Sequence, residues 1–155
     1  MGFFSGHRLM PIYLDSLRQY GINTSLMPAK LHVAIMEESE RDSLRTASRI
    51  PGFDKDSVVE GGVSLIGELV ALLVLGPSIF DNSRKNSLSR SFMSASQMIE
   101  ELAEKWISAG ANSSNASKEA VAFRVLTRID QSGFLNQEFV NSMRVEVARQ
   151  QALGH

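Results

Sequence analysis

Apolar residues are densest between residues 57 and 75, where the chain reads SVVEGGVSLIGELVALLVL. After Glu68 no polar residue interrupts the run from Leu69 to Leu75, so a helix there would be apolar on every side. Such a helix belongs inside a folded domain, because it offers no face to water. The pattern therefore predicts a buried central helix over about 57–75.

The first half of this segment has two further features. A polar stripe follows one side of the helix, formed by Ser57, Glu60, Ser64 and Glu68. The helix also contains three glycines, Gly61, Gly62 and Gly67, which lower its helix propensity. Glycines inside a helix usually allow another backbone to approach closely. We therefore expect the helix to begin at the surface, to end buried and to be crossed closely by its neighbours.

Two amphipathic segments precede the central helix. The first covers about 10–20, and because a helix tolerates proline only in its first turn, we expect it to begin at Pro11. The second begins near residues 24–25 and buries apolar residues up to Ile35. Residues 37–43 are then polar on every side of a helix. We expect this stretch to be exposed or to break the helix before Pro51-Gly52 ends it.

Three more amphipathic helices are predicted after the central one, over about 87–109, 117–131 and 136–151. In the first of them apolar residues repeat at alternating steps of four and three, from Leu88 to Trp106. No stretch shows the two-residue alternation of a half-buried strand. The sequence therefore predicts an all-α fold: a single helical domain over residues 1–155, built as a five- or six-helix bundle around the central helix.

Composition narrows the classes of function. A formal net charge of −1 gives no global field that would attract nucleic acid or an anionic membrane. The chain has 0 cysteines, which excludes a disulfide scaffold, a thiolate metal site and a cysteine nucleophile. The N-terminus lacks the apolar core of a signal peptide, so we expect a cytoplasmic protein. Glu68 and Gly76-Pro77 interrupt the apolar run, which favours a buried helix over a membrane span.

Glu68 is the most informative single residue for chemistry. The favoured interpretation makes it the last member of the polar stripe, at the rim of the bundle. In the alternative it is buried, its pKa rises and it could act as the acid or base of an enzyme. Two acidic clusters raise the question of a carboxylate-bridged metal pair: Glu37, Glu38 and Glu40, and Glu100, Glu101 and Glu104. That site needs a histidine three residues after a glutamate, and no glutamate here has one, so we expect no metal or cofactor.

A basic row on the second helix is the leading candidate for a contact surface. Arg41, Arg45 and Arg49 are spaced by four residues, and Glu37 is placed to form an ion pair with Arg41. Arginine is the cation most enriched in protein interfaces. A second basic cluster follows the central helix. We therefore expect a protein partner to be bound by Glu37, Glu38, Arg41, Arg45, Arg49, Arg84, Lys85 and Arg90.

Three other interpretations remain open. Flexible and aromatic side chains could line a pocket for a small apolar ligand or lipid: Phe92, Met93, Met98, Trp106 and Phe123. The last two helices could form a DNA-reading helix-turn-helix, whose side chains able to contact bases are Asn136, Gln137, Asn141 and Arg144. The near-neutral charge does not favour nucleic acid. Self-association into a homo-oligomer is compatible with each of these functions.

Overall fold

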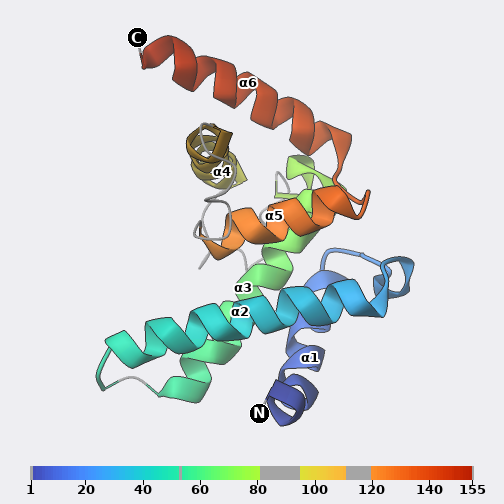
Figure 1. Ribbon diagram of the computed structural model, residues 1–155. Coiled ribbons are helices and arrows are strands. Elements are labelled where there is room, and N and C mark those ends of the chain that lie inside the picture. Colours follow the sequence, from blue (N-terminus) through green and yellow to red (C-terminus); the bar gives the residue numbers. More distant parts are fainter. Residues whose placement is uncertain (1, 53, 81–94, 111–119, 155) are drawn as a thin grey trace. The chain divides into compact units, whose positions relative to one another are not determined.

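The computed structural model describes residues 2–52, 54–80, 95–110 and 120–154; for residues 2–7, 80 and 110 it describes only the backbone. These ranges contain six α-helices and no strand, as predicted for an all-α fold (Figure 1). In chain order the helices are α1 (Gly2–Arg18), α2 (Ala29–Arg49), α3 (Lys55–Leu75), α4 (Ala95–Gly110), α5 (Val121–Gln131) and α6 (Gln137–Leu153).

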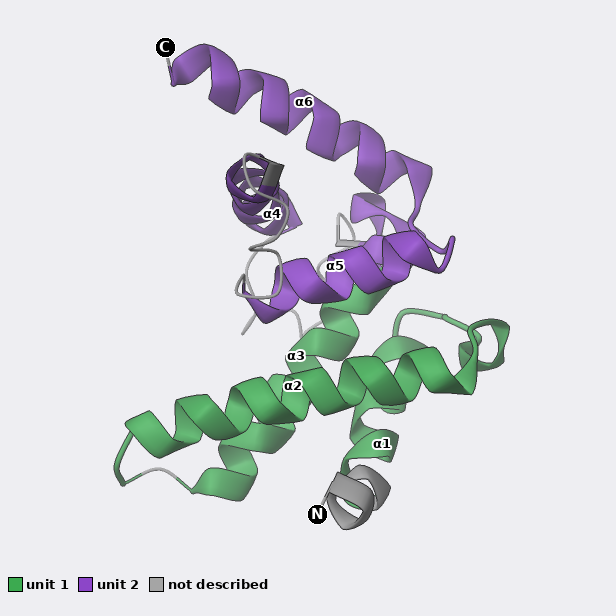
Figure 2. Ribbon diagram, in the orientation of Figure 1, with its two compact units in different colours: residues 1–71 green, residues 72–155 purple. Residues whose placement is uncertain are grey.

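The chain forms two compact units, residues 1–71 and 72–155 (Figure 2). Unit 1 contains α1, α2 and most of α3, whereas unit 2 contains the last turn of α3 and the helices α4 to α6. The boundary falls inside α3, which is one continuous helix. This division leaves the expectation of a single folding domain untested.

The central helix follows its predicted course. Its start, residues 55–57, is exposed, and five consecutive residues from Leu69 to Leu73 are buried. Gly76, at φ +94°, ends the helix in the left-handed region that favours glycine. α3 is also the one helix, among the described residues, that is long and apolar enough to cross a membrane by length and composition. Because the core helix of a globular domain passes the same test, this finding does not distinguish the two.

The first helix differs from the prediction. α1 begins at Gly2, so Pro11 lies inside the helix rather than in its first turn. Proline removes one backbone hydrogen bond there. The helix nevertheless continues because Leu9, Tyr13 and Leu17, each four residues from the next, are fully buried on one face. Tertiary packing thus outweighs the local penalty of the proline.

Two of the three glycines of α3 mark close helix crossings. A Cβ at Gly67 would lie 2.4 Å from Ser16 Cβ and 3.0 Å from the carbonyl oxygen of Tyr13, so α1 crosses α3 at this point. A Cβ at Gly62 would lie 2.0 Å from Ser43 Oγ of α2. The prediction of close approach is confirmed at these two positions. It is wrong at Gly61, where nothing lies within 4 Å.

The polar stretch 37–43 corrects another prediction. α2 passes through it without a break, and Glu38 and Glu40 are only 7% and 8% exposed. Ser39 and Ser43 are buried too, and Ser39 Oγ donates a hydrogen bond of 3.2 Å to the carbonyl oxygen of Gly62. Small serines allow α2 to approach the glycine of α3, so this polar sequence forms a helix contact instead of a solvated face.

Candidate functional site

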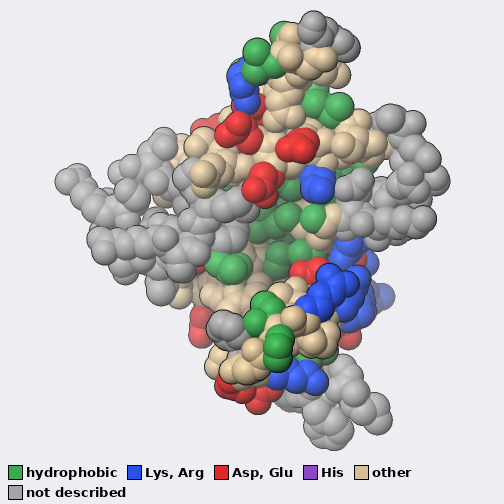
Figure 3. All heavy atoms as spheres, turned by 90° about the vertical axis from the view of Figure 1, so that its left-hand side faces the viewer, with side chains coloured by type: hydrophobic (Ala, Val, Ile, Leu, Met, Phe, Trp, Pro, Cys, Tyr) green, Lys and Arg blue, Asp and Glu red, His purple; other side chains and the backbone are tan. Residues whose placement is uncertain are grey.

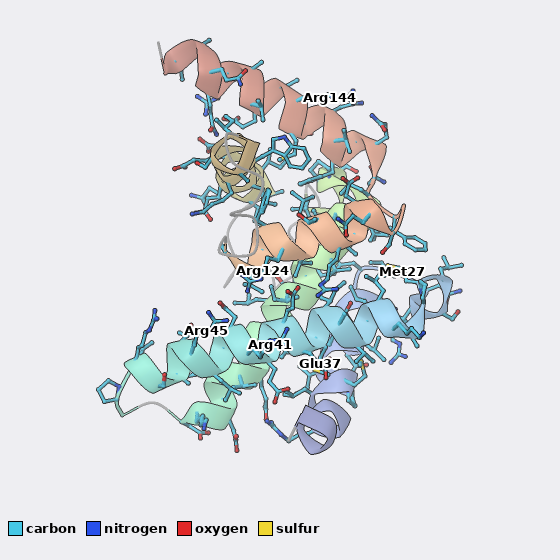
Figure 4. All side chains as sticks on the ribbon, viewed as in Figure 1. Met27, Glu37, Arg41, Arg45, Arg124 and Arg144 are labelled. Atoms are coloured by element: carbon cyan, nitrogen blue, oxygen red, sulfur yellow. The ribbon has the colours of Figure 1, made fainter. Side chains whose placement is uncertain are left out.

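The arginine row of α2 is exposed as predicted. Arg41, Arg45 and Arg49 are all exposed, and Arg41 and Arg45 lie one turn apart on the helix (Figure 4). The space-filling view shows Lys and Arg side chains gathered on the lower part of the visible face (Figure 3). None of the three guanidinium groups forms an ion pair with a residue that the structure describes. The row is therefore available to a partner.

The acidic residues near this row behave differently from the prediction. The expected ion pair between Glu37 and Arg41 is absent from the described residues, and Glu37 is half-buried. Glu38 and Glu40 are buried, so they do not form the solvated acidic edge that their sequence suggested. The exposed face is consequently more basic than expected. Arg84, Lys85 and Arg90, the other half of the predicted surface, lie outside the described residues.

Glu68 is buried at 4% exposure, so the favoured interpretation, a rim position, is wrong. Its Oε2 atom has no hydrogen-bond partner among the described residues. Desolvation by burial raises the pKa of Glu68 to about 7. The pKa of Tyr20 rises to about 12, first because the phenol is desolvated and second because the charge of Glu68 opposes a second negative charge. Neither of the two cavities described in unit 2 is lined by Glu68.

Sequence reasoning missed a buried polar chain in unit 1. The hydroxyl of Tyr13 lies 3.0 Å from Nδ1 of His32, and Nε2 of His32 lies 2.8 Å from the carbonyl oxygen of Thr24. Because a carbonyl only accepts, Nε2 carries the proton and Nδ1 accepts from the tyrosine hydroxyl. Both side chains are buried, and the two partners of His32 lie 19 and 8 residues before it in sequence. No local pattern could have paired them. These two hydrogen bonds join α1, α2 and the turn before α2.

The predicted base-reading residues of the last two helices have structural roles in part. The backbone N–H of Asn136 donates to the carbonyl oxygen of Leu73 at 2.7 Å, and its Nδ2 donates to Val74 O at 3.1 Å. Its Oδ1 accepts from the N–H of Glu138, which caps α6. Gln137 donates to Asn141. Arg144 alone of the predicted set is exposed without such a role.

A groove in unit 2 lies between α4, α5 and α6 and has a volume of about 430 Å³. Of the five side chains predicted to line a pocket, Trp106 lines this groove, whereas Met98 and Phe123 are buried in the core. Phe92 and Met93 lie outside the described residues. Most of the apolar lining comes instead from α6: Phe139, Val140, Met143 and Val147.

Comparisons with known proteins give no further guide. No protein-family model matches the chain, and no curated protein or solved structure matches it. In the described ranges no group of three or more His, Asp or Glu side chains is placed to hold a metal ion. Function must therefore be argued from the two surfaces described here, the arginine row of α2 and the groove of unit 2.

Proposed function

We propose that the chain is a non-catalytic protein-interaction module that binds and regulates, or neutralises, a protein partner through the exposed arginine row of α2. The observation that supports this proposal is that Arg41, Arg45 and Arg49 are exposed without an ion pair among the described residues. A helix spaces such residues by about 6 Å per four positions, which fixes the pattern that a partner must match. The planar guanidinium groups favour paired hydrogen bonds with carboxylates.

The burial of Glu38 and Glu40 strengthens the case for an acidic partner. Because these carboxylates are withdrawn from the exposed face, the partner has to supply the negative charge that balances the row. Surface charges of this kind act mainly on the rate and specificity of association. Binding should therefore weaken as salt rises, since ions screen exposed charges beyond about 10 Å at 0.1 M.

Charge reversal tests this surface. In Arg41→Glu/Arg45→Glu, tagged protein should no longer retain the partner that the unchanged protein captures from native lysate, as identified by mass spectrometry. The melting temperature should change little, because both side chains are exposed and unpaired among the described residues.

The matched control is Lys30→Glu/Lys105→Glu, which changes the net charge equally at two exposed positions outside the row. It should retain the partner, and untagged protein should compete for it. Equal capture by the Arg41→Glu/Arg45→Glu variant would show that the row is not the contact surface.

A second candidate function is the binding of a small apolar ligand or lipid, and the groove of unit 2 supports it. Its volume of about 430 Å³ falls within the range of roughly 300–1,000 Å³ typical of ligand sites. Native mass spectrometry of freshly purified protein would reveal a retained ligand. Absence of any bound species, together with no thermal shift on adding a fatty acid, would count against this function.

The two remaining interpretations gain less support. DNA reading loses Asn136, whose polar groups are engaged within unit 2. Catalysis by Glu68 lacks a described cavity that would bring a substrate to the carboxyl group. A cytoplasmic location is part of our proposal and rests on the sequence alone. A homo-oligomer stays compatible with it.

A further inference from the structure

The groove of unit 2 results from the divergence of two helices. α5 and α6 leave their common turn in different directions, and α4 lies between their far ends (Figure 1). α6 packs along α4, where Arg149 pairs with Glu100 at 3.0 Å. The space between α5 and α6 is left as a groove, and Trp106, Asp130 and Arg144 among its lining residues are exposed to solvent.

The floor of the groove is apolar. Leu126 of α5 and two residues of α6, Phe139 and Met143, are buried beneath it. Val140 and Val147 form a half-buried wall at helical spacing. The α6 residues that line it run from Phe139 to Gln151, a length of about 18 Å at 1.5 Å per residue. This length equals about three turns of a helix.

The rim of the groove carries opposite charges on its two sides. Asp130 lies at the end of α5 and Arg144 lies on α6, and both are exposed (Figure 4 labels Arg144). Neither forms an ion pair with a residue that the structure describes. Trp106 of α4 completes the rim and is 44% exposed. A ligand in the groove would meet one negative and one positive side chain.

We infer that this groove binds an amphipathic helix of a partner protein, about 12 residues long, with apolar residues at i, i+3 or i+4, and i+7 in the groove. An acidic residue on one flank of this helix faces Arg144, and a basic residue on the other flank faces Asp130. Helix-in-groove recognition uses this spacing, and flexible methionine and exposed tryptophan are frequent in such grooves. Two opposite rim charges also fix the direction in which the helix lies.

The shape of the groove favours a helix over a small molecule. Ligand sites bury about 70–90% of a small ligand's surface, whereas the exposed rim of this groove leaves one side of an occupant in water. A helix with a polar outer face suits that environment, because its apolar stripe alone enters the groove. The groove lies in unit 2 and the arginine row in unit 1, so each interaction can fail without the other.

The chain contains 1 tryptophan, Trp106, so its fluorescence reports directly on the groove. The probe is a synthetic, tryptophan-free helix of about 14 residues, stapled to hold its conformation, with a leucine stripe, lysines on one flank and glutamates on the other. A second peptide has the same leucine stripe but glutamines on both flanks. The peptide whose charges match the rim should shift Trp106 emission to the blue and bind at least about fivefold more tightly than the other.

Variants of the rim and wall make the test specific. Asp130→Asn/Arg144→Gln should give the two peptides equal affinities. Val147→Glu should abolish binding by placing a charge in the wall. Val145→Glu, on the same helix but 71% exposed and outside the groove lining, should bind the matched peptide normally. So should Arg41→Glu/Arg45→Glu, which separates this inference from the α2 surface.

Three results would overturn the inference. Equal affinity of the unchanged protein for the two peptides would show that the rim charges select nothing. A blue shift with oleate but with neither peptide would make the groove a lipid site. A shift that depends only on protein concentration, with no peptide added, would show that a second copy of this chain occupies it.

Discussion

Glu68 places a carboxyl group in the interior of unit 1. Its side chain is buried, and Oε2 lacks a hydrogen-bond partner among the described residues. Burial raises its pKa to about 7 from an ordinary value of 4.5. The folded state therefore holds a proton that the unfolded chain has already released between these two pH values.

This difference makes stability depend on pH. The free energy of unfolding should fall as pH rises from 4.5 through 7, because deprotonation leaves a buried charge in the folded state. With a difference of about 2.5 pH units, the full effect above pH 7 is roughly 3 kcal/mol. We expect Glu68→Gln to be more stable than the unchanged protein at pH 8 and close to it at pH 5.

Urea unfolding at the two pH values measures this effect. The control is Glu104→Gln, which removes an exposed carboxyl group on α4 and should leave the pH dependence in place. If Glu68→Gln showed the same loss of stability between pH 5 and pH 8 as the unchanged protein, the burial of an unpaired carboxyl group at this position would be refuted.

At the residue scale, the sequence predicted which side of a helix a residue occupies better than whether that side is buried. The helical period places Glu68 on the same side as Ser64, and Ser64 Oγ lies 3.0 Å from Ser16 Oγ of α1. The helical period does not reveal which other helix covers that side. Here α1 covers it at Ser64. The pair of Tyr13 and His32 was missed for a related reason, since it depends on how α1 packs against α2.

At the scale of the helices, close crossings explain two of the glycines. A Cβ at Gly67 would meet Ser16 Cβ and the backbone oxygen of Tyr13, and backbone cannot move aside cheaply. Gly67→Ala should therefore lower the free energy of unfolding by about 1–3 kcal/mol, despite the better helix propensity of alanine. Gly61→Ala, where nothing lies within 4 Å, should raise it by up to about 1 kcal/mol.

Thermal and chemical unfolding of the two variants measures both changes. The two positions lie in the same helix, and both variants carry the same substitution. A similar stabilisation by Gly67→Ala and Gly61→Ala would contradict the close crossing of α1 and α3.

The helices themselves were largely predictable, because amphipathic periodicity and glycine or proline stops mark them. The errors fell where packing overrode local pattern. Pro11 lies within α1 because the stripe from Leu9 to Leu17 is buried, and residues 37–43 stay helical because Ser39 and Ser43 meet Gly62. A polar serine can serve as a small packing residue, which a division into polar and apolar positions does not show.

For the whole molecule, the candidate groove was the least predictable feature. The sequence identified the apolar stripe of α6 but not that α5 would diverge from it. A stripe that is covered and a stripe that lines a groove have the same period. The arginine row was more accessible to prediction, because a spacing of four residues places Arg41, Arg45 and Arg49 on one side of a single helix. The same spacing rule did not reveal that Glu38 and Glu40 are buried.

The continuity of α3 through both units leads to a prediction about unfolding. Residues up to Ala71 belong to unit 1 and those from Leu72 to unit 2, so melting of either unit removes part of a helix that the other needs. We expect a single cooperative transition, in which far-ultraviolet circular dichroism and Trp106 fluorescence give the same midpoint. Because Trp106 lies in unit 2, Gly67→Ala in unit 1 should lower the midpoint reported by its fluorescence as much as the midpoint reported by circular dichroism. Two separate transitions, with the fluorescence midpoint unchanged by this substitution, would show instead that residues 1–71 and 72–155 fold as independent domains.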